Sequence, residues 1–451
     1  MATAVAERPT GSYRPQFEEM PPAALRDLQE RKLRSQLAYL WDRSPFYREK
    51  LSTAGVTSKD VRTIDDLAQV PFTTKDELRA SQLAHPPLGA HAAASMEEVV
   101  RVHASSGTTG RPSYIGVTKH DAAMWAESVA RAYYSQGVRP SSILALGFGT
   151  GFFVGGIAVQ AACEAIGATV VPVGVGASDR LVSAFDDLGA DQLTCTPSYA
   201  RYLAEYLRTK LGRDPRELGV ERIFLGAEPG GGVPAVRAHL EELWGARVSE
   251  SIGNGDVLPV YAGDCEERAG AHFQAPDLVI MEVIDPDTGR GLSLEEPEVH
   301  GELVFTHIDR ECVPLVRFRS RDLAVVRTGP CPCGRTGPRL RVVGRTDDLL
   351  IVKGVNVWPS AVKDVITSLR PLTTGEFEIL LRNPPPVIDG PLPLRVEHGD
   401  GAVDVDAIRR RVTEELRARL IVATEVEMVP PGSLPRFEMK AKLIRKLYEE
   451  G

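Results

Sequence analysis

Cysteine is scarce in this chain, with 6 among 451 residues. That density is too low for a disulfide-stapled fold, so we expect reduced thiols, a cytoplasmic setting and cysteines free to bind metal. Long apolar runs are also missing, since none reaches the roughly 18 residues that a membrane-spanning helix needs. Residues 1–16 lack an apolar centre and are not expected to act as a secretory signal. We therefore expect no membrane partner.

A positive net charge is absent as well, because the formal charge is −8. Nucleic-acid-binding domains are usually basic, so we predict no nucleic-acid partner. The apolar content of 43% and charged content of 25% are those of an ordinary globular protein. A chain of this length is expected to form two or three domains.

Apolar runs and helical patterns alternate in the middle of the chain. This alternation predicts an α/β fold with parallel strands covered by helices on both faces. The expected strands are 143–146, 168–173, 192–195 and 222–225, and the expected helices are 156–166, 197–211 and 233–243.

The pattern changes on either side of this region. A single helical stretch is expected at 25–50, and antiparallel strands are expected at 279–284 and 301–306. After residue 344, strands near 377–381 and 394–397 and a helix at 405–420 predict a smaller α+β unit. We predict a flexible N-terminal arm (1–20), a large α/β domain with a β-rich subdomain (21–344) and a small mobile C-terminal domain (345–451).

The loop at residues 103–112 carries the most specific signal. Glycines allow backbone N–H groups to approach a polyanion, hydroxyls add donors, and an arginine adds positive charge. The ordinary P-loop ends in Gly-Lys-Ser/Thr, and this loop does not. The predicted phosphate cradle consists of Ser105, Ser106, Gly107, Thr108, Thr109, Gly110 and Arg111.

Several single residues are candidates for a role around bound phosphates. Asp256 follows a predicted strand, where a carboxylate could hold Mg²⁺, or it belongs to a polar turn. Asp322 could accept hydrogen bonds from a ribose diol, or it belongs to a surface Arg–Asp network. The adjacent acids Asp347 and Asp348 form a polar pivot or a helix cap. Lys440 could reach an anionic centre from a terminal loop, or it is simply solvated.

A second set of residues has the chemistry of a metal site. Cys265, His272, Cys331 and Cys333 supply the four nitrogen and sulfur ligands that suit tetrahedral zinc. Such a site would be structural, because four protein ligands leave no open position. The C-x-C spacing is tighter than the usual C-x₂-C, and four unliganded side chains remain the alternative. Core positions are expected for the other three cysteines, Cys163, Cys195 and Cys312.

A Gly/Phe loop follows the predicted strand at 143–146, at the strand end where α/β sheets bind ligands. Phe148 and Phe153 could wall a flat ring, and Gly149 would leave room for it. Ordinary core packing of the two rings is the alternative. The loop is our candidate pocket for an aromatic group.

In their order along the chain, these motifs resemble the phenylacetate–coenzyme A ligase family of adenylate-forming enzymes. The segments 44–48 and 70–75 also resemble that family, and the resemblance extends from about residue 25 to 447. It implies the adenylate-forming fold and ATP-dependent conversion of a carboxylic acid, expected to be aromatic, into an acyl-adenylate. Transfer to coenzyme A, magnesium and a structural zinc are implied too, and a homodimer is compatible with it.

The resemblance also implies roles for individual residues. The adenine would be bordered by Gly226, Ala227, Glu228 and Pro229, and the ribose would contact Asp322 and Arg345. Asp256 would bind magnesium, Asp347 would be the hinge of the small domain, and the zinc ligands would be the Cys/His set. Lys440 would serve adenylation, and Lys353 would approach the acyl centre after the small domain rotates.

The chain departs from the family pattern in three places, the last of which has two residues. Ile252 stands where an aromatic residue usually stacks near the adenine, and Asp256 stands where glutamate is common. Phe437 and Met439 stand where small residues usually precede the lysine. Two alternative functions follow: adenylation with transfer to an amine or a small inorganic nucleophile, or a catalytically impaired nucleotide-binding relative.

Overall fold

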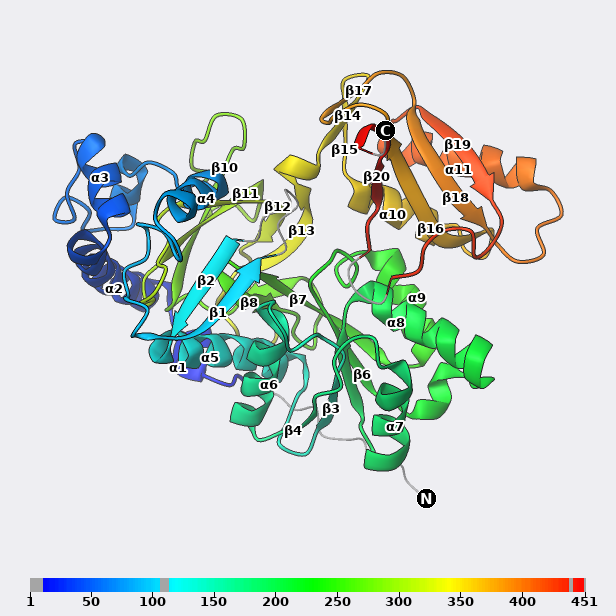
Figure 1. The fold of residues 1–451 in the computed structure, drawn as a ribbon, viewed down its shortest axis with the longest axis horizontal. Coiled ribbons are helices and arrows are strands. Elements are labelled where there is room, and N and C mark those ends of the chain that lie inside the picture. The colour runs from blue at the N-terminus through cyan, green and yellow to red at the C-terminus, as the bar shows by residue number, and fades with distance from the viewer. Residues whose placement is uncertain (1–10, 106–112, 438–440, 450–451) are drawn as a thin grey trace. The chain divides into compact units, whose positions relative to one another are not determined.

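The computed structural model describes residues 11–105, 113–437 and 441–449 (Figure 1). The chain divides into two compact units. The first unit comprises residues 1–174, 251–320 and 326–340, and the second comprises 175–250, 321–325 and 341–451. The domain boundary that we predict between residues 344 and 345 stays a prediction.

The first unit opens with the helices α1 (Pro15–Glu18), α2 (Pro22–Arg43), α3 (Pro45–Thr53) and α4 (Lys75–Ala84). The single helix expected at 25–50 is therefore wrong, because the chain breaks at Ser44. The Ser44 hydroxyl accepts a hydrogen bond from the Tyr47 backbone N–H and caps α3. Pro45 has no N–H to continue α2, and its fixed φ suits the first turn of the next helix.

Part of the expected N-terminal arm is attached to the first unit. Residues 1–10 lie outside the described range, but α1 ends at Glu18, whose side chain is fully buried. The Glu18 carboxylate pairs with Arg335 at 2.8 Å. Because a buried charge is costly unless it is paired, this contact anchors residues near α1.

The sheets of the first unit match the predicted strand types. The strands β3 (Ile143–Leu146) and β4 (Thr169–Val171) are parallel and are joined through α6 (Gly155–Ile166). The later strands β10 (Val279–Ile284) and β11 (Glu298–His307) are antiparallel, as are β8 (Leu258–Gly263) and β9 (Ala271–Phe273). A separate hairpin joins β1 (Val99–Ser105) and β2 (Ser113–Thr118), ahead of α5 (Lys119–Gln136).

The second unit contains the remaining alternating segment. The strands β5 (Gln192–Cys195), β6 (Arg222–Leu225) and β7 (Arg247–Asn254) pair in parallel over their residues in this unit. The helices α7 (Ser178–Leu188), α8 (Pro197–Tyr206) and α9 (Pro234–Trp244) connect or flank them. The predicted helix at 197–211 is α-helical only to Tyr206 and ends in a π-helical turn, Leu207–Leu211.

The C-terminal part of the second unit has its own apolar core. Four strands lie in the order β19–β18–β16–β20, namely Thr424–Val429, Leu392–His398, Thr373–Leu381 and Ile444–Lys446. The helices α10 (Pro359–Ser368) and α11 (Val405–Leu420) contribute Val362 and Val412 to the core beneath them. A small sheet contains β14 (Leu350–Val352), β15 (Val355–Val357) and β17 (Val387–Ile388). Two further strands, β12 (Phe318–Arg327) and β13 (Arg339–Arg345), precede it.

Within the described part of the chain, none of the helices combines the length and apolarity required to cross a membrane.

Candidate active site

The predicted phosphate cradle begins at the end of β1. Ser105 is the last residue of that strand and pairs with Ser113, the first residue of β2, so the loop closes a hairpin. The other cradle residues, Ser106, Gly107, Thr108, Thr109, Gly110 and Arg111, lie outside the described residues. The pairing of β1 with β2 therefore fixes the two ends of the loop, Ser105 and Ser113.

A lysine joins this hairpin to the predicted magnesium residue. The Lys75 ammonium donates to the Ser105 hydroxyl at 2.9 Å and forms an ion pair with the Asp256 carboxylate. The side chains of Lys75 and Asp256 are only 17% and 10% exposed. Thr74 and Glu77 form a capping box at the start of α4, and this box fixes Lys75 as the first helical residue.

Our sequence reasoning did not single out Lys75. The available signal was the segment 70–75, which we used only for the family resemblance. In the structure, this lysine is the cation paired with the Asp256 carboxylate. An ammonium and a metal ion meet the same electrostatic requirement of a buried carboxylate.

The local backbone sets the position of Asp256. The register of β7 against β8 shifts between Ile252 and Asn254, as in a β-bulge. A Cβ at Gly253 would lie 1.8 Å from the Pro259 carbonyl oxygen, so only glycine fits there. The Asn254 side chain then accepts the Asp256 backbone N–H at 3.1 Å. The predicted metal residue thus sits in a built turn after the strand.

A buried histidine lies beside this carboxylate. Burial lowers the pKa of His91 to about 4, although the Asp256 charge opposes that change. His91 is therefore neutral at pH 7, and its Nδ1 lies 3.1 Å from the Ser81 hydroxyl. A cavity here is lined by Leu78, Gln82, His91, Ser113, Tyr114, Ile115, Asp256, Val313 and Leu315.

The aromatic loop lies next to the phosphate hairpin. The Ala104 N–H of β1 donates to the Phe152 carbonyl at 2.9 Å. Phe153 is 44% exposed and Phe148 is partly buried, so neither ring is fixed in the apolar core. The Gly149 carbonyl packs against Gly156 at the start of α6. These observations leave the two rings accessible, and the acid pocket itself stays a prediction.

In the second unit, the predicted adenine loop follows β6. Ala227 has a φ of +69°, a left-handed conformation that costs about 1 kcal/mol for a residue with a Cβ. The Glu228 carboxylate accepts hydrogen bonds from the Ser198 N–H at 2.6 Å and the Ala441 N–H at 2.7 Å. Lys440 lies outside the described residues, but its neighbour Ala441 is held by this loop.

The predicted ribose and hinge residues are connected by one arginine. The Arg345 guanidinium contacts Asp322 at 2.8 Å and grips Asp347 at 2.8 and 3.1 Å. Burial acts to lower the pKa of Arg345, but these carboxylates outweigh it and the net pKa is raised. Asp347 also pairs with Arg321 at 3.5 Å. The two arginines, Arg345 and Arg321, therefore hold the Asp347 carboxylate in place.

Lys353 lies at the tip of the hairpin between β14 and β15. Both central residues of the turn have positive φ values, +50° for Lys353 and +83° for Gly354. This is the backbone geometry of a two-residue turn that matches the twist of its strands. Both residues are exposed, so the turn presents the Lys353 ammonium to solvent.

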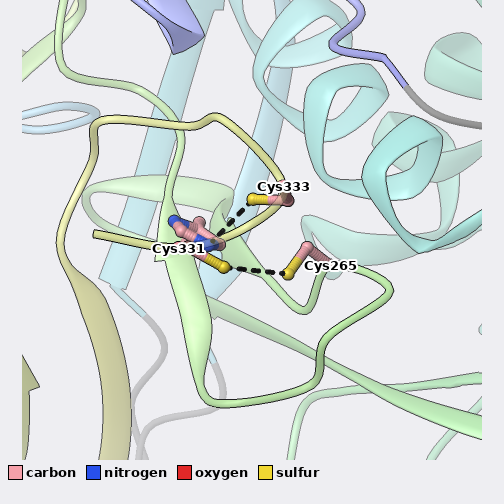
Figure 2. Close-up of side chains that lie close together, drawn as sticks. Cys265, Cys331 and Cys333 are labelled. Carbon is pink, nitrogen blue, oxygen red and sulfur yellow. Dashed lines mark hydrogen bonds between the residues drawn. The ribbon is translucent and has the colours of Figure 1, made fainter. Parts of the chain in front are cut away.

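The predicted metal ligands do come together. The ligand atoms of Cys265, His272, Cys331 and Cys333 all lie within 4.8 Å of one another. Figure 2 shows the Cys331 and Cys265 sulfurs facing each other, and they are 3.8 Å apart. Cys333 lies 3.4 Å from His272 Nε2. The other cysteines, Cys163, Cys195 and Cys312, are buried as expected.

These distances fit the chemistry of zinc. Tetrahedral zinc with bonds of about 2.3 Å to sulfur and 2.0 Å to nitrogen places two sulfurs about 3.8 Å apart and sulfur and nitrogen about 3.5 Å apart. His272 Nδ1 donates to the Gly337 carbonyl at 2.9 Å, which leaves the lone pair of Nε2 to bind a metal ion. The Gly334 backbone N–H donates to the Cys331 carbonyl at 3.1 Å, and this hydrogen bond closes the turn between the two residues.

Two family models match the chain. The model described as AMP-binding enzyme matches residues 20–308. The model described as AMP-binding enzyme C-terminal domain matches residues 354–446. Together they cover both the phosphate hairpin and the terminal segment.

Individual relatives match along most of the chain. The phenylacetate-coenzyme A ligase of Thermus thermophilus is 39% identical, with 94% of this chain and 97% of the relative covered. A 2-hydroxyisobutyryl-CoA ligase in the postadenylation state, in complex with R3-HIB-AMP, has a TM-score of 0.90 at 29% identity, covering 100% of this chain and 95% of that one. The same ligase with 2-HIB-AMP and CoA in the thioesterification state has a TM-score of 0.72 at 31% identity, covering 99% and 94%.

Proposed function

Because the chain belongs to the phenylacetate–coenzyme A ligase family of AMP-binding enzymes, we propose that its acid substrate is aromatic. The chain is an AMP-forming acid–CoA ligase. It converts a carboxylic acid and ATP into an acyl-adenylate and pyrophosphate, and then transfers the acyl group to coenzyme A. The contact that carries this function is the bridge from Lys75 to Ser105 and Asp256 at the mouth of the phosphate loop.

Charge repulsion is the main obstacle to the first step. The acid carboxylate must approach the α-phosphate of ATP, and both groups are negative. Fixed cations around the reacting atoms lower this barrier without covalent help from the protein. We assign this role to Lys440 and Arg111, with Lys75 supplying positive charge beside Ser105.

Nucleotide binding is assigned to the remaining polar residues. The phosphate loop from Ser105 to Arg111 would hold the phosphates, and the segment from Gly226 to Pro229 would border the adenine. Asp322 would accept the ribose hydroxyls while Arg345 holds it by their 2.8 Å contact. Lys353, at its exposed turn, is assigned to the second half-reaction, and Asp347 is assigned to the hinge.

Two metal ions fit the residues present. Asp256 offers a hard oxygen ligand of the kind magnesium prefers, and the lysine paired with it shows that this carboxylate attracts a cation. Magnesium would supply charge neutralisation to the phosphates when bound. The Cys/His set fits zinc in number, atom type and distance, and its role would be structural. We further propose a cytoplasmic location, which keeps these thiols reduced, and a homodimer.

Pyrophosphate release tests this function. The enzyme is incubated with ATP, magnesium and a panel of aryl and alkyl acids, each with and without coenzyme A. We expect acid-dependent release that is fastest with aryl acids and turns over repeatedly only with coenzyme A. Fast turnover with alkyl acids alone would contradict the aromatic assignment. Turnover with an amine instead of coenzyme A would contradict the assignment of coenzyme A as the acyl acceptor.

The metal role of Asp256 predicts a specific change in the Asp256→Asn variant. The amide keeps the size of the side chain but removes the charge, so magnesium affinity falls by about tenfold or more, since affinity follows ligand charge. The measurement is pyrophosphate release at varied magnesium, where the half-saturating concentration should rise while KM for the acid is unchanged. Asp309→Asn is the matched control, because Asp309 is paired with Lys32 at 2.6 Å in the same unit. Equal magnesium curves for both variants would refute the assignment.

A further inference from the structure

The segment that joins β6 to α9 has few side chains to hold it in shape. It begins with the predicted adenine loop, Gly226 to Pro229, and continues through three glycines, residues 230–232. A Cβ at Gly230 would lie 2.4 Å from the Pro197 ring, so glycine lets the segment pass this close to α8. Because glycines leave the backbone free to adopt many conformations, contacts from other elements must fix this segment.

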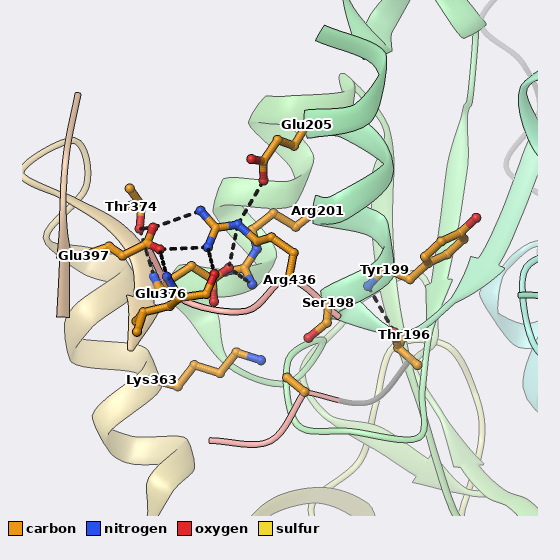
Figure 3. A network of polar contacts seen from close by, with 12 residues as sticks. Thr196, Ser198, Tyr199, Arg201, Glu205, Lys363, Thr374, Glu376, Glu397 and Arg436 are labelled. Carbon is orange, nitrogen blue, oxygen red and sulfur yellow. Dashed lines mark hydrogen bonds and ion pairs between the residues drawn. The ribbon is translucent and has the colours of Figure 1, made fainter. Parts of the chain in front are cut away.

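A buried lysine of α10 supplies one such contact. The Lys363 ammonium donates a hydrogen bond to the Pro229 carbonyl at 3.0 Å, and only 6% of the lysine is exposed. Figure 3 shows its side chain extending from α10 toward the start of α8, where Ser198 lines the same small cavity. Among the residues that the structure describes, the Pro229 carbonyl is the one hydrogen-bond acceptor that this ammonium reaches.

The position of this ammonium is costly. Burial lowers the pKa of Lys363, and this effect outweighs the Glu228 and Glu376 carboxylates, which act to raise it. Both carboxylates are engaged by other groups, because Glu228 accepts the Ser198 N–H at 2.6 Å and Glu376 pairs with Arg201. A buried cation costs more free energy than an apolar side chain in the same place. What the cation gains there is a hydrogen bond to the adenine loop.

The next residue of α10 holds the other end of the segment. The Asp364 carboxylate accepts a hydrogen bond from the Ala235 N–H, in the first turn of α9, at 3.3 Å. Val233, the N-cap residue of α9, has no side-chain acceptor, so Asp364 takes the place of a cap. Its negative charge also suits the positive end of the helix dipole. Two consecutive residues of α10 thus contact both ends of residues 229–235.

We propose that Lys363 and Asp364 are positioning residues that shape the adenine loop for nucleotide binding. The proposal rests on the proposed function, in which Gly226 to Pro229 border the adenine. Neither residue touches the nucleotide in this scheme. Lys363 fixes the Pro229 carbonyl and Asp364 fixes the helix that follows, so the left-handed Ala227, with its φ of +69°, is held between β6 and a fixed Pro229.

The test compares a ligand that carries the base with one that does not. The full-length enzyme and its Lys363→Met variant are titrated by calorimetry with AMP and, separately, with magnesium tripolyphosphate. Methionine keeps the length and the apolar stem of the lysine but removes the donor. We expect the dissociation constant for AMP to rise by about tenfold, roughly the contribution of one hydrogen bond from a charged group, and that for tripolyphosphate to stay unchanged. The preference for ATP over GTP in kcat/KM should also fall by about tenfold.

Lys446→Met is the matched control. It makes the same replacement in β20, where the lysine pairs with Glu449 at 2.9 Å, and it should leave both dissociation constants at wild-type values.

A second pair of variants tests the contact with α9. Asp364→Ala should weaken AMP binding by about fivefold, the usual loss with a helix cap. Asp404→Ala removes the cap of α11, which accepts the Ala407 N–H at 2.8 Å, and should leave AMP binding unchanged. If Lys363→Met does not fold, this pair decides the proposal.

Unchanged AMP affinity in the α10 variants would overturn the proposal, and so would equal losses of AMP and tripolyphosphate affinity, which indicate general destabilisation. If the wild type binds AMP and releases pyrophosphate with an acid while the variants behave like it, only the positioning role is refuted and the proposed function stands. If the wild type binds tripolyphosphate but not AMP, the adenine assignment is wrong, and the positioning role falls with it.

Discussion

Replacing Lys440 with alanine is expected to slow acyl-adenylate formation by about 10²–10³-fold, the usual loss when one preorganised charge-stabilising group is removed. Thioester formation from supplied acyl-AMP should continue near the wild-type rate, because that step no longer brings a carboxylate against a phosphate. The two rates are measured as pyrophosphate release with acid and ATP, and as thioester formed from purified acyl-AMP and coenzyme A.

Lys442 provides the matched control for this experiment. It carries the same charge two residues further along and is exposed. Lys442→Ala should keep both rates, which would show that the terminal positive charge as a whole is not responsible. Slow use of supplied acyl-AMP by the Lys440→Ala variant would contradict the division of labour between the two half-reactions.

Loss of zinc is the second large effect that we expect. A ligand at about 1,000 times its dissociation constant stabilises the folded state by about 4 kcal/mol. Since each kcal/mol moves Tm by about 2–4 °C in a unit of this size, Cys331→Ser should lower Tm by about 8–16 °C. The purified variant should contain no zinc, whereas the wild type should contain one ion per chain by metal analysis.

Cys163 is the control for this change, because it is a buried cysteine of the first unit that lies outside the metal cluster. Cys163→Ala should lower Tm only through lost packing and should retain its zinc. Wild-type protein that carries no zinc, and whose Tm is indifferent to added zinc or to a chelator, would contradict the metal assignment.

Local sequence predicted most elements of the fold because their signals are local. The strands at 143–146, 192–195, 222–225 and 279–284 and the helix at 405–420 have the predicted bounds. Each is an apolar run or a periodic pattern that ends at turn residues. The break at Ser44 was missed, since apolar periodicity continues through it and only the cap and Pro45 interrupt the hydrogen bonds.

The four Cys and His residues that we assign to zinc were also recognisable as a candidate set from the sequence, since few residue types bind zinc. The sequence could not show that Cys265 and Cys331 lie 3.8 Å apart, because 65 residues of chain separate them and only the packed strands bring them together. The functional interpretation was confirmed by the comparisons with known families. The ordered motifs predicted an AMP-forming acid–CoA ligase, and the family comparisons agree.

The sequence by itself determined which groups are available: a glycine- and hydroxyl-rich loop that we assign to phosphates, acids that we assign to metal and ribose, and a terminal lysine. Tertiary structure alone decided how these groups are supported. Lys75 became the partner of Asp256, and Arg436 became the link between Glu397 and Glu205, through contacts between residues 39 to 231 positions apart. Such pairings depend on where whole strands and helices pack, and no local pattern of side chains encodes them.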